Sequence, residues 1–198
     1  MIEQRSDEWF EIRHGMITAS RVADLMAKTK SGYSKSRENY ITQCAIERIT
    51  GRRVESYSNQ FMQRGIELEP EAMEAYEADQ MVSVEPAEFT VHPTMKFLGA
   101  SPDGLVGDGL LEVKCRNVTA HFDYLRTKKI EKATIIQMHV QMMCLERSWC
   151  DFVGYHPDFP EHLKLFIQRV HLDKKLVEEI TKEVTEAETE IQKIMSEL

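Results

Sequence analysis

Two acidic residues and a lysine within residues 101–114 have the types and spacing needed to bind a metal ion and activate a water molecule. Asp103 lies in one run of strand-forming residues, and Glu112 and Lys114 lie in the next. The turn Gly107-Asp108-Gly109 between them is typical of a β-hairpin, which would bring Asp103 close to Glu112. Because side chains alternate along a strand, Glu112 and Lys114 should share one face.

This arrangement has a catalytic and a structural interpretation. Two converging carboxylates are the ligands that Mg²⁺ prefers, with Mn²⁺ as a substitute. A neighbouring ammonium group can orient water and stabilise charge that develops on a phosphate. Alternatively, the segment is an ordinary hairpin with a solvated Glu–Lys face. Against this, Leu111, Val113 and Cys115 make the strand apolar enough to be buried, and a buried charged pair must be compensated. The pattern alone leaves both interpretations open.

The hydrophobic pattern predicts the elements that position this hairpin. Helices are expected over 6–10, from Thr18 or Ser20 to 26, and over 38–50, 61–76, 135–145 and 173–198. Strands are expected over 82–89, 90–97, 97–106, 110–115, 149–155 and 163–170, with a polar loop over 28–35. This order predicts one α/β or α+β domain over residues 1–198, in which helices pack on a mostly antiparallel sheet.

Length, hydropathy and charge set wider limits. A chain of 198 residues has the length of one domain. No apolar run approaches the ~20 residues of a membrane span, and the N-terminus has no apolar signal core, so we expect a cytoplasmic protein with no membrane partner. Residues 1–53 hold ten bases and seven acids, whereas residues 173–198 hold eight acids and four bases. A nucleic-acid site should therefore draw on the N-terminal part.

The four cysteines are scattered and form no C-x-x-C pair. This spacing argues against a zinc site, and a cytosolic location argues against disulfides. An iron–sulfur cluster needs closely spaced cysteines, and only Cys144 and Cys150 come near that. We therefore expect buried thiols at Cys44, Cys115, Cys144 and Cys150.

The hairpin residues also match a known signature. Pro102-Asp103, eight intervening residues and Glu112-Val113-Lys114 form the motif of the PD-(D/E)XK nucleases. With three further segments, the chain resembles the phage lambda exonuclease-like (YqaJ-type) viral recombinase family over roughly residues 4–160. This resemblance implies a PD-(D/E)XK, restriction-endonuclease-like core, in which a central mixed sheet is flanked by helices. The further segments are Trp9-x-x-x-Arg13-x-Gly15-x-x-Thr18-Ala19-Ser20, Gly65-Ile66-Glu67-Leu68-Glu69, and Gln137-Met138-His139-Val140-Gln141-Met142 followed by residues 149–157.

The resemblance assigns metal ligands to this chain. Asp103 and Glu112 would hold two Mg²⁺ ions, with the carbonyl group of Val113 completing one site. Glu69 would be a further ligand, although without the family it could equally be a surface acid, and Glu67 is a close alternative.

The resemblance also assigns roles in catalysis and in binding the DNA end. Lys114 would activate the attacking water, and Gln137 would position that water or hold Lys114 in place. Taken by itself, Gln137 is an ordinary polar helix residue. Arg13 and Ser20 resemble residues that bind a 5′-phosphate, and the hydroxyl of Ser101 would join them. The alternative for Arg13 is a solvated charge on a helix.

Three further positions concern DNA contacts. The family places an arginine where this chain has Ala120, with Arg116 and His121 nearby, so the phosphate pocket departs from the family pattern. Lys30 matches a residue that enters the DNA groove. Met62 matches an apolar wedge that splits the terminal base pair, although a methionine of the core is the simpler interpretation.

The activity implied is that of a 5′→3′ exonuclease on linear duplex DNA that leaves 3′ single-stranded overhangs for phage-type recombination. Such enzymes form homotrimeric rings and pass the exposed strand to a single-strand annealing protein, in a bacterial host that carries a phage or prophage. Two alternatives remain from the residues: a PD-(D/E)XK endonuclease or RecB-like nuclease module, and a non-catalytic DNA-binding protein on the same fold. The intact set of Asp103, Glu112 and Lys114 argues against the latter.

Overall fold

A four-stranded sheet carries the predicted hairpin. Its strands are β6 (Gly104–Val106), β7 (Gly109–Lys114), β8 (Trp149–Tyr155) and β9 (Leu165–His171), in that order. The computed structural model describes residues 4, 6–30, 32–54 and 60–198. β6 and β7 are antiparallel, β7 and β8 parallel, and β8 and β9 antiparallel, so the predicted mixed sheet is confirmed. In the β6–β7 turn, Gly107 has a φ of 55°, which favours glycine.

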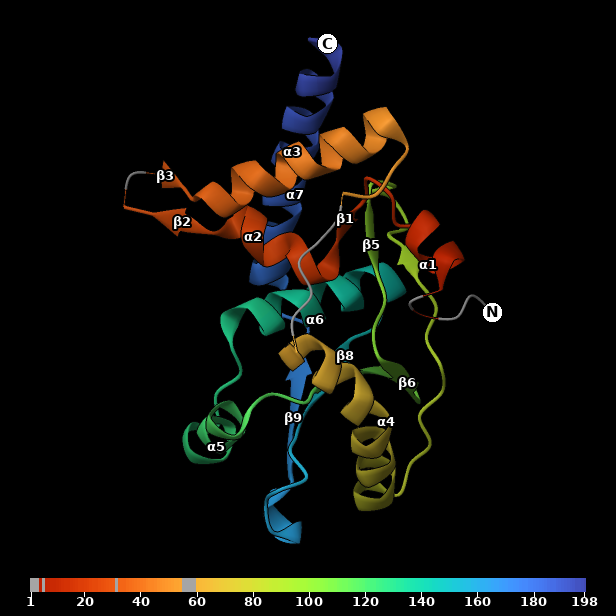
Figure 1. The fold of residues 1–198 in the computed structure, drawn as a ribbon, viewed down its shortest axis with the longest axis vertical. Coiled ribbons are helices and arrows are strands. Elements are labelled where there is room, and N and C mark those ends of the chain that lie inside the picture. The colour runs from red at the N-terminus through yellow and green to blue at the C-terminus, as the bar shows by residue number, and fades with distance from the viewer. Residues whose placement is uncertain (1–3, 5, 31, 55–59) are drawn as a thin grey trace.

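Helices cover both faces of this sheet (Figure 1). Leu111 and Val113 of β7 pack with Ala72 and Tyr76 of α4 (Gln60–Gln80). Leu110 packs instead with Tyr124 of α5 (Val118–Thr127) and with Met138 and Met142 of α6 (Lys132–Leu145). Since the strand alternates, Glu112 lies on the face of Leu110, which is the face toward α6.

A second core lies on the far side of α6. It is formed by α2 (Val22–Met26), α3 (Lys35–Thr50), α6, α7 (Lys174–Ser196) and two neighbouring strands of a small three-stranded sheet, which contribute Ile17, Leu98 and Ala100. That sheet has the order β1 (Ile17–Thr18), β5 (Leu98–Ala100), β4 (Thr90–Val91). The apolar stripe of α7 is buried here through Ile180, Val184, Ala187 and Ile191.

α6 is therefore enclosed by two cores. Ile136 and Val140 face the helical core, whereas Met138 and Met142 face the four-stranded sheet. A helix that is apolar on all sides is expected to be buried. Figure 1 shows α6 crossing the molecule between the helices above it and the sheet below.

Several predicted boundaries are wrong. The segment 82–89 is not a strand, because its β-prone residues meet a partner at a single bridge, Glu85 to Leu105. The expected strand 90–97 shortens to β4, and 97–106 is divided into β5 and β6 by residues 101–103. The loop 28–35 contains a short hairpin, β2 (Lys28–Thr29) with β3 (Gly32–Tyr33).

Several short elements were not predicted or differ from the pattern. α5 was missed; its N-cap Asn117 accepts a hydrogen bond from the backbone N–H of Ala120 at 2.9 Å. The N-terminal helix is α1 (Asp7–Glu11), and two single turns of 3₁₀ helix are η1 (Ala19–Arg21) and η2 (Glu161–Leu163).

All four cysteines are free thiols in the structure, and the predicted burial holds for three of them. Cys44, Cys144 and Cys150 are buried and Cys115 is half-buried. Burial raises the pKa of the Cys44 thiol to about 11 and that of Cys144 to about 12, so neither thiol is reactive near neutral pH. Among the described helices, none combines the length and apolarity that a membrane crossing requires.

Candidate active site and phosphate pocket

The β6–β7 hairpin brings Asp103 against the strand that carries Glu112. The backbone N–H of Asp103 donates to the carbonyl group of Leu111 at 3.1 Å. In return, Oδ2 of Asp103 accepts a hydrogen bond from the backbone N–H of Val113 at 2.7 Å. The carboxyl group of Asp103 is thus fixed beside β7, as the hairpin pattern predicted.

Glu112 is completely buried, with a side-chain exposure of 0%. Its Oε1 accepts a short hydrogen bond from Nζ of Lys114, two residues along the same face. Its Oε2 accepts a hydrogen bond from Nε2 of Gln141 in α6 at 2.6 Å. A buried carboxylate must be compensated in this way, so the interpretation as a solvated Glu–Lys face is wrong.

Gln141 was present in the motif over residues 137–142 but received no role from the sequence. Its Oε1 is buried and has no hydrogen-bond partner among the described residues. Gln137 lies one turn earlier in α6 and is half-buried. Within the described part of the chain it forms no hydrogen bond with Lys114 or Glu112, so its role remains a prediction.

The charges of the site strongly affect one another. Burial, and then the negative charge of Glu112, raise the pKa of the Asp103 carboxyl group well above its ordinary value. Burial lowers the pKa of Lys114, but the carboxylates of Glu112 and Asp103 outweigh this and raise it overall. Lys114 is therefore a cation at neutral pH, and its positive charge interacts favourably with both carboxylates, Glu112 and Asp103.

Glu69 of α4 reaches the same group of charges. Its negative charge is among the causes that raise the pKa of Asp103 and of Cys115. Glu67 is exposed and accepts a hydrogen bond from Gln63 at 3.2 Å, on the outer side of α4. This geometry favours Glu69 over Glu67 as the helix carboxylate of the site.

The donor set fits a hard divalent cation. No cluster of three His, Cys, Asp or Glu side chains is assembled closely enough to count as a complete metal site in the described residues. Asp103 and Glu112, however, are adjacent carboxylates whose mutual repulsion a cation would relieve. Oxygen ligands from carboxylates are those that Mg²⁺ and Mn²⁺ prefer.

A separate cavity of about 280 Å³ brings together two of the predicted phosphate-binding residues, Arg13 and Ser20. Its volume is far larger than the ~30 Å³ that one water occupies in the liquid. Trp9, Arg21 and Arg53 also line it. The cavity thus combines arginine side chains with a hydroxyl group, which are suitable partners for a phosphate.

Arg13 is held against an aromatic ring in this cavity. Its guanidinium carbon lies 3.7 Å from the centroid of the Trp9 ring. Burial, and to a smaller extent the nearby charge of Arg53, lower the pKa of Arg13 to about 10, although the Tyr40 ring partly opposes this. No carboxylate forms a salt bridge with Arg13 in the described parts of the chain. The interpretation of Arg13 as a solvated helix charge does not fit this environment.

Ser101 is connected to the cavity through Trp9. The indole Nε1–H of Trp9 donates to Oγ of Ser101 at 3.1 Å. Ser101 itself does not line the cavity among the described residues. Its predicted contact with a phosphate stays a prediction; the contact that the structure shows is with the Trp9 ring, on which Arg13 packs.

The turn that carries Arg13 is fixed by α3. Gly15 follows with a φ of 65°, and its backbone N–H donates to Oε2 of Glu47 at 3.0 Å. The carbonyl group of Gly15 accepts from Nε of Arg48 at 2.7 Å, and Arg48 forms two 2.7 Å hydrogen bonds with Glu188 of α7. An added Cβ at Gly15 would lie 2.4 Å from the Arg48 side chain. Only glycine fits here.

The residues near position 120 do not complete the cavity. Ala120 lies in the first turn of α5, and His121 is buried and donates from Nε2 to the carbonyl group of Leu163 at 2.8 Å. Arg116 lies 4.0 Å from Glu131. None of the three lines the Arg13 cavity within the described residues, so Arg53 and Arg21 are the other arginines there.

The structure describes the side chain of only one of the two residues that were predicted to contact the DNA groove or end. Lys30 is exposed in the turn of the β2–β3 hairpin. The side chain of Met62 lies outside the described residues, so its assignment stays a prediction.

Comparison with known proteins identifies the family. The chain matches the model of the YqaJ-like viral recombinase domain over residues 8–148. A search among curated proteins found no match. The alkaline exonuclease LHK-Exo from Laribacter hongkongensis is 41% identical, with a TM-score of 0.90 over 96% of this chain and 95% of that chain. Its complex with dAMP has a TM-score of 0.87 at 41% identity over 97% of both chains.

A phage-related exonuclease from Haemophilus somnus 129PT shares the fold at 17% identity, with a TM-score of 0.76 over 93% of this chain and 96% of that chain. The family model covers most of the chain, and the similarity to LHK-Exo extends over nearly all of it. The chain therefore belongs to the YqaJ-like viral recombinase domain family, as its motifs indicate, and it is an enzyme of the nuclease class.

Proposed function

We propose that this protein is a magnesium-dependent 5′→3′ exonuclease that degrades one strand of linear duplex DNA from its end and leaves 3′ single-stranded overhangs. The observation that carries the proposal is the fully buried Glu112 beside Asp103 and Lys114. A binding protein has no use for a buried acid whose pKa is raised by a second carboxylate beside it. LHK-Exo supports the exonuclease class, and its dAMP complex contains the kind of mononucleotide that an exonuclease releases.

Metal ligation is assigned to residues of both hairpin strands and of α4. Asp103, Glu112 and Glu69 would hold two Mg²⁺ ions together with the carbonyl group of Val113. Bound Mg²⁺ lowers the pKa of water and neutralises charge on the scissile phosphate. Asp103 is oriented for this by the N–H of Val113, and Glu112 by Gln141.

Lys114 is assigned to the attacking water. Its raised pKa keeps it protonated, so it acts as a hydrogen-bond donor that orients the nucleophile and stabilises negative charge on the phosphate. Gln137, on the same helix as Gln141, would position the water.

The direction of digestion is assigned to the Arg13 cavity. A terminal 5′-phosphate bound by Arg13 and Ser20 would place the first phosphodiester of that strand toward the metal site. Arg53, whose charge already acts on Arg13, would contribute where the family pattern has an arginine near position 120. Ser101 would hold the Trp9 ring, and Lys30 and Met62 would contact the duplex.

The same family membership supports a proposal for the biological setting. We propose that the whole chain acts as one exonuclease domain within a homotrimeric ring, in the cytoplasm of a bacterial host. There it would pass the exposed strand to a single-strand annealing protein for phage-type recombination.

The decisive experiment compares linear duplex DNA with covalently closed circular DNA in Mg²⁺. Degradation of the linear substrate alone, with release of 5′-mononucleotides from the 5′-end, is expected. Cutting of the circle would show an endonuclease instead. Binding without cleavage of either substrate would show a DNA-binding protein that has lost activity.

A further inference from the structure

The β2–β3 hairpin carries an unusual concentration of positive charge. Residues 28–37 contain four bases and no acids. The hairpin extends away from the body of the molecule beyond the first turn of α3 (Figure 1). Its two ladder pairs are Lys28 with Tyr33 and Thr29 with Gly32, and Lys30 lies in the exposed turn between them. A two-stranded hairpin of this size is at best marginally stable by itself, so something else must fix it.

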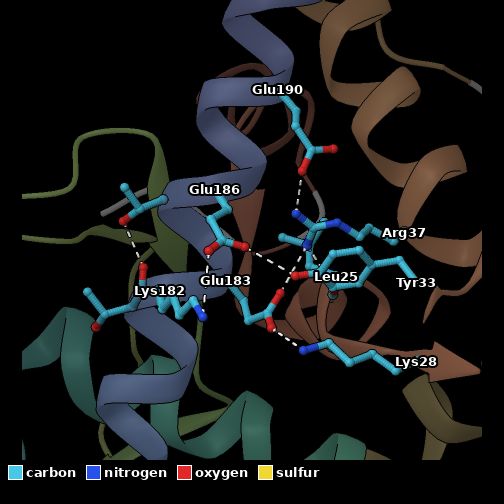
Figure 2. Close-up of polar contacts among 10 residues, drawn as sticks. Leu25, Lys28, Tyr33, Arg37, Lys182, Glu183, Glu186 and Glu190 are labelled. Carbon is cyan, nitrogen blue, oxygen red and sulfur yellow. Dashed lines mark hydrogen bonds and ion pairs between the residues drawn. The ribbon is translucent and has the colours of Figure 1, made fainter.

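α7 supplies that support through Glu183. One carboxylate oxygen, Oε1, accepts a hydrogen bond from Nζ of Lys28 at 2.7 Å, and the other, Oε2, accepts from Arg37 at 3.3 Å. Figure 2 shows the carboxylate between these two side chains, which come from the start of the hairpin and from α3 just after it. The side chain of Glu183 is only 8% exposed, and its hydrogen bonds outweigh burial to lower its pKa, so it is ionised at neutral pH.

Arg37 ties the other end of the hairpin to the same helix. It is 2% exposed and donates to the carbonyl group of Leu25 at 2.9 Å and to Glu190 at 2.6 Å. Its guanidinium carbon lies 4.0 Å from the centroid of the Tyr33 ring, and the hydroxyl group of Tyr33 donates to Glu186 at 3.1 Å (Figure 2). A buried ion pair contributes little net stability, but it is well suited to fix one geometry.

The four bases of residues 28–37 therefore have different roles. Lys28 and Arg37 form ion pairs with Glu183 of α7, and Lys35 forms one with Glu38. Lys30 forms no ion pair within the described residues. Its charge, at the tip of a projecting arm, is directed to solvent and to any anion that approaches.

We propose that Glu183 is a positioning residue for duplex DNA: it holds the β2–β3 hairpin so that Lys30 meets the DNA backbone. This inference rests on the proposed nuclease function. It also gives a role to three acids of α7, Glu183, Glu186 and Glu190, which hold the hairpin or Arg37 next to it.

An argument from net charge alone predicts the opposite effect of a Glu183 substitution on DNA binding, so an experiment can distinguish the two. Glu183→Gln removes one negative charge and should tighten DNA binding if charge alone matters. If Glu183 positions Lys30, the same substitution should weaken binding. Glu179→Gln is the matched control, because it changes the charge of the protein by the same amount. Glu179 is exposed and lies one turn earlier on α7.

The measurement is the Kd for a blunt duplex in EDTA as a function of salt concentration, together with the hydrolysis rate at saturating DNA in Mg²⁺. Loss of one phosphate contact weakens binding by up to about tenfold at roughly 0.1 M salt and lowers the salt slope by about 1. Glu183→Gln and Lys30→Ala should each show this change, whereas Glu179→Gln should change neither the Kd nor the hydrolysis rate. The double variant should bind no worse than Lys30→Ala alone, because both act through one contact.

Tyr33→Phe provides a second variant that leaves charge and the buried ion pairs intact. It should weaken binding less than Glu183→Gln, and that effect should disappear in the Lys30→Ala background. Tighter binding by Glu183→Gln, or additive effects in the double variant, would overturn the inference. Both outcomes leave the nuclease proposal standing, which fails only if the wild type does not degrade linear DNA.

Discussion

Gln141 of α6 donates a 2.6 Å hydrogen bond to the buried carboxylate of Glu112 in β7, across 29 residues of sequence. This contact ties the central helix to the strand that carries the candidate catalytic pair. Gln137 lies one turn away in the same helix and forms no hydrogen bond with Glu112 among the described residues. The two glutamines should therefore have different roles.

The first prediction compares these two glutamines. Gln141→Leu leaves one oxygen of Glu112 without its partner and should lower the free energy of unfolding by about 1–3 kcal/mol. Gln137→Leu should leave stability nearly unchanged while slowing hydrolysis. Urea denaturation and steady-state digestion measure the two effects. Equal destabilisation by both substitutions would contradict this division of roles.

The second prediction concerns the hairpin acids and lysine. Asp103→Asn, Glu112→Gln and Lys114→Ala should each abolish nearly all hydrolysis, since charge stabilisation at the metal supplies much of the rate. DNA binding should be retained, as measured by mobility shift. Substantial turnover by any purified, folded variant would refute the site.

The third prediction is a gain of stability at the cost of activity. Burial and the charge of Glu112 raise the pKa of Asp103, so its ionised form destabilises the metal-free fold at neutral pH. Asp103→Asn keeps an oxygen for the N–H of Val113 but removes the charge. In EDTA the free energy of unfolding of Asp103→Asn should be higher than that of the wild type, as measured by urea denaturation at neutral pH. A less stable Asp103→Asn variant would contradict this prediction, because it would show that the ionised carboxylate stabilises the metal-free fold.

The fourth prediction concerns the metal. Hydrolysis should require Mg²⁺ or Mn²⁺ and should be lost in Ca²⁺, whose longer and looser coordination suits binding better than catalysis. Release of nucleotides is measured in each ion. Full activity in EDTA would exclude the metal mechanism.

The fifth prediction tests the Arg13 cavity. Arg13→Ala should slow digestion of 5′-phosphorylated ends by roughly ten- to a hundredfold, because a charge-assisted contact contributes about 1.5–3 kcal/mol. Digestion of 5′-hydroxyl ends should change little, so the preference for phosphorylated ends disappears. If both ends slow equally and more so at high salt, Arg13 provides only general affinity for DNA.

Local features of the site could be predicted from the sequence. The hairpin, the shared face of Glu112 and Lys114, and the strand at 149–155 depend on alternation and turn residues that lie close together in the chain. The family motifs added Arg13, Ser20 and Glu69, which the structure places in the cavity or near the hairpin.

Features that depend on distant packing could not be predicted. α6 is apolar on all sides, so periodicity does not indicate which glutamine faces the sheet. The contact between Trp9 and Ser101 joins residues 92 positions apart. The strand expected over 82–89 fails because β-propensity does not guarantee a neighbouring strand to pair with.

The enclosure of α6 between two cores has a consequence for how the protein opens. The helical core and the sheet core both pack on this one helix, so separation of either core would expose one apolar side of α6 to water. The two layers should then behave as one cooperative unit rather than as independent foldons. The amide protons of α6 should be among the slowest to exchange with solvent, and any opening that separates α6 from the sheet should break the Glu112–Gln141 contact.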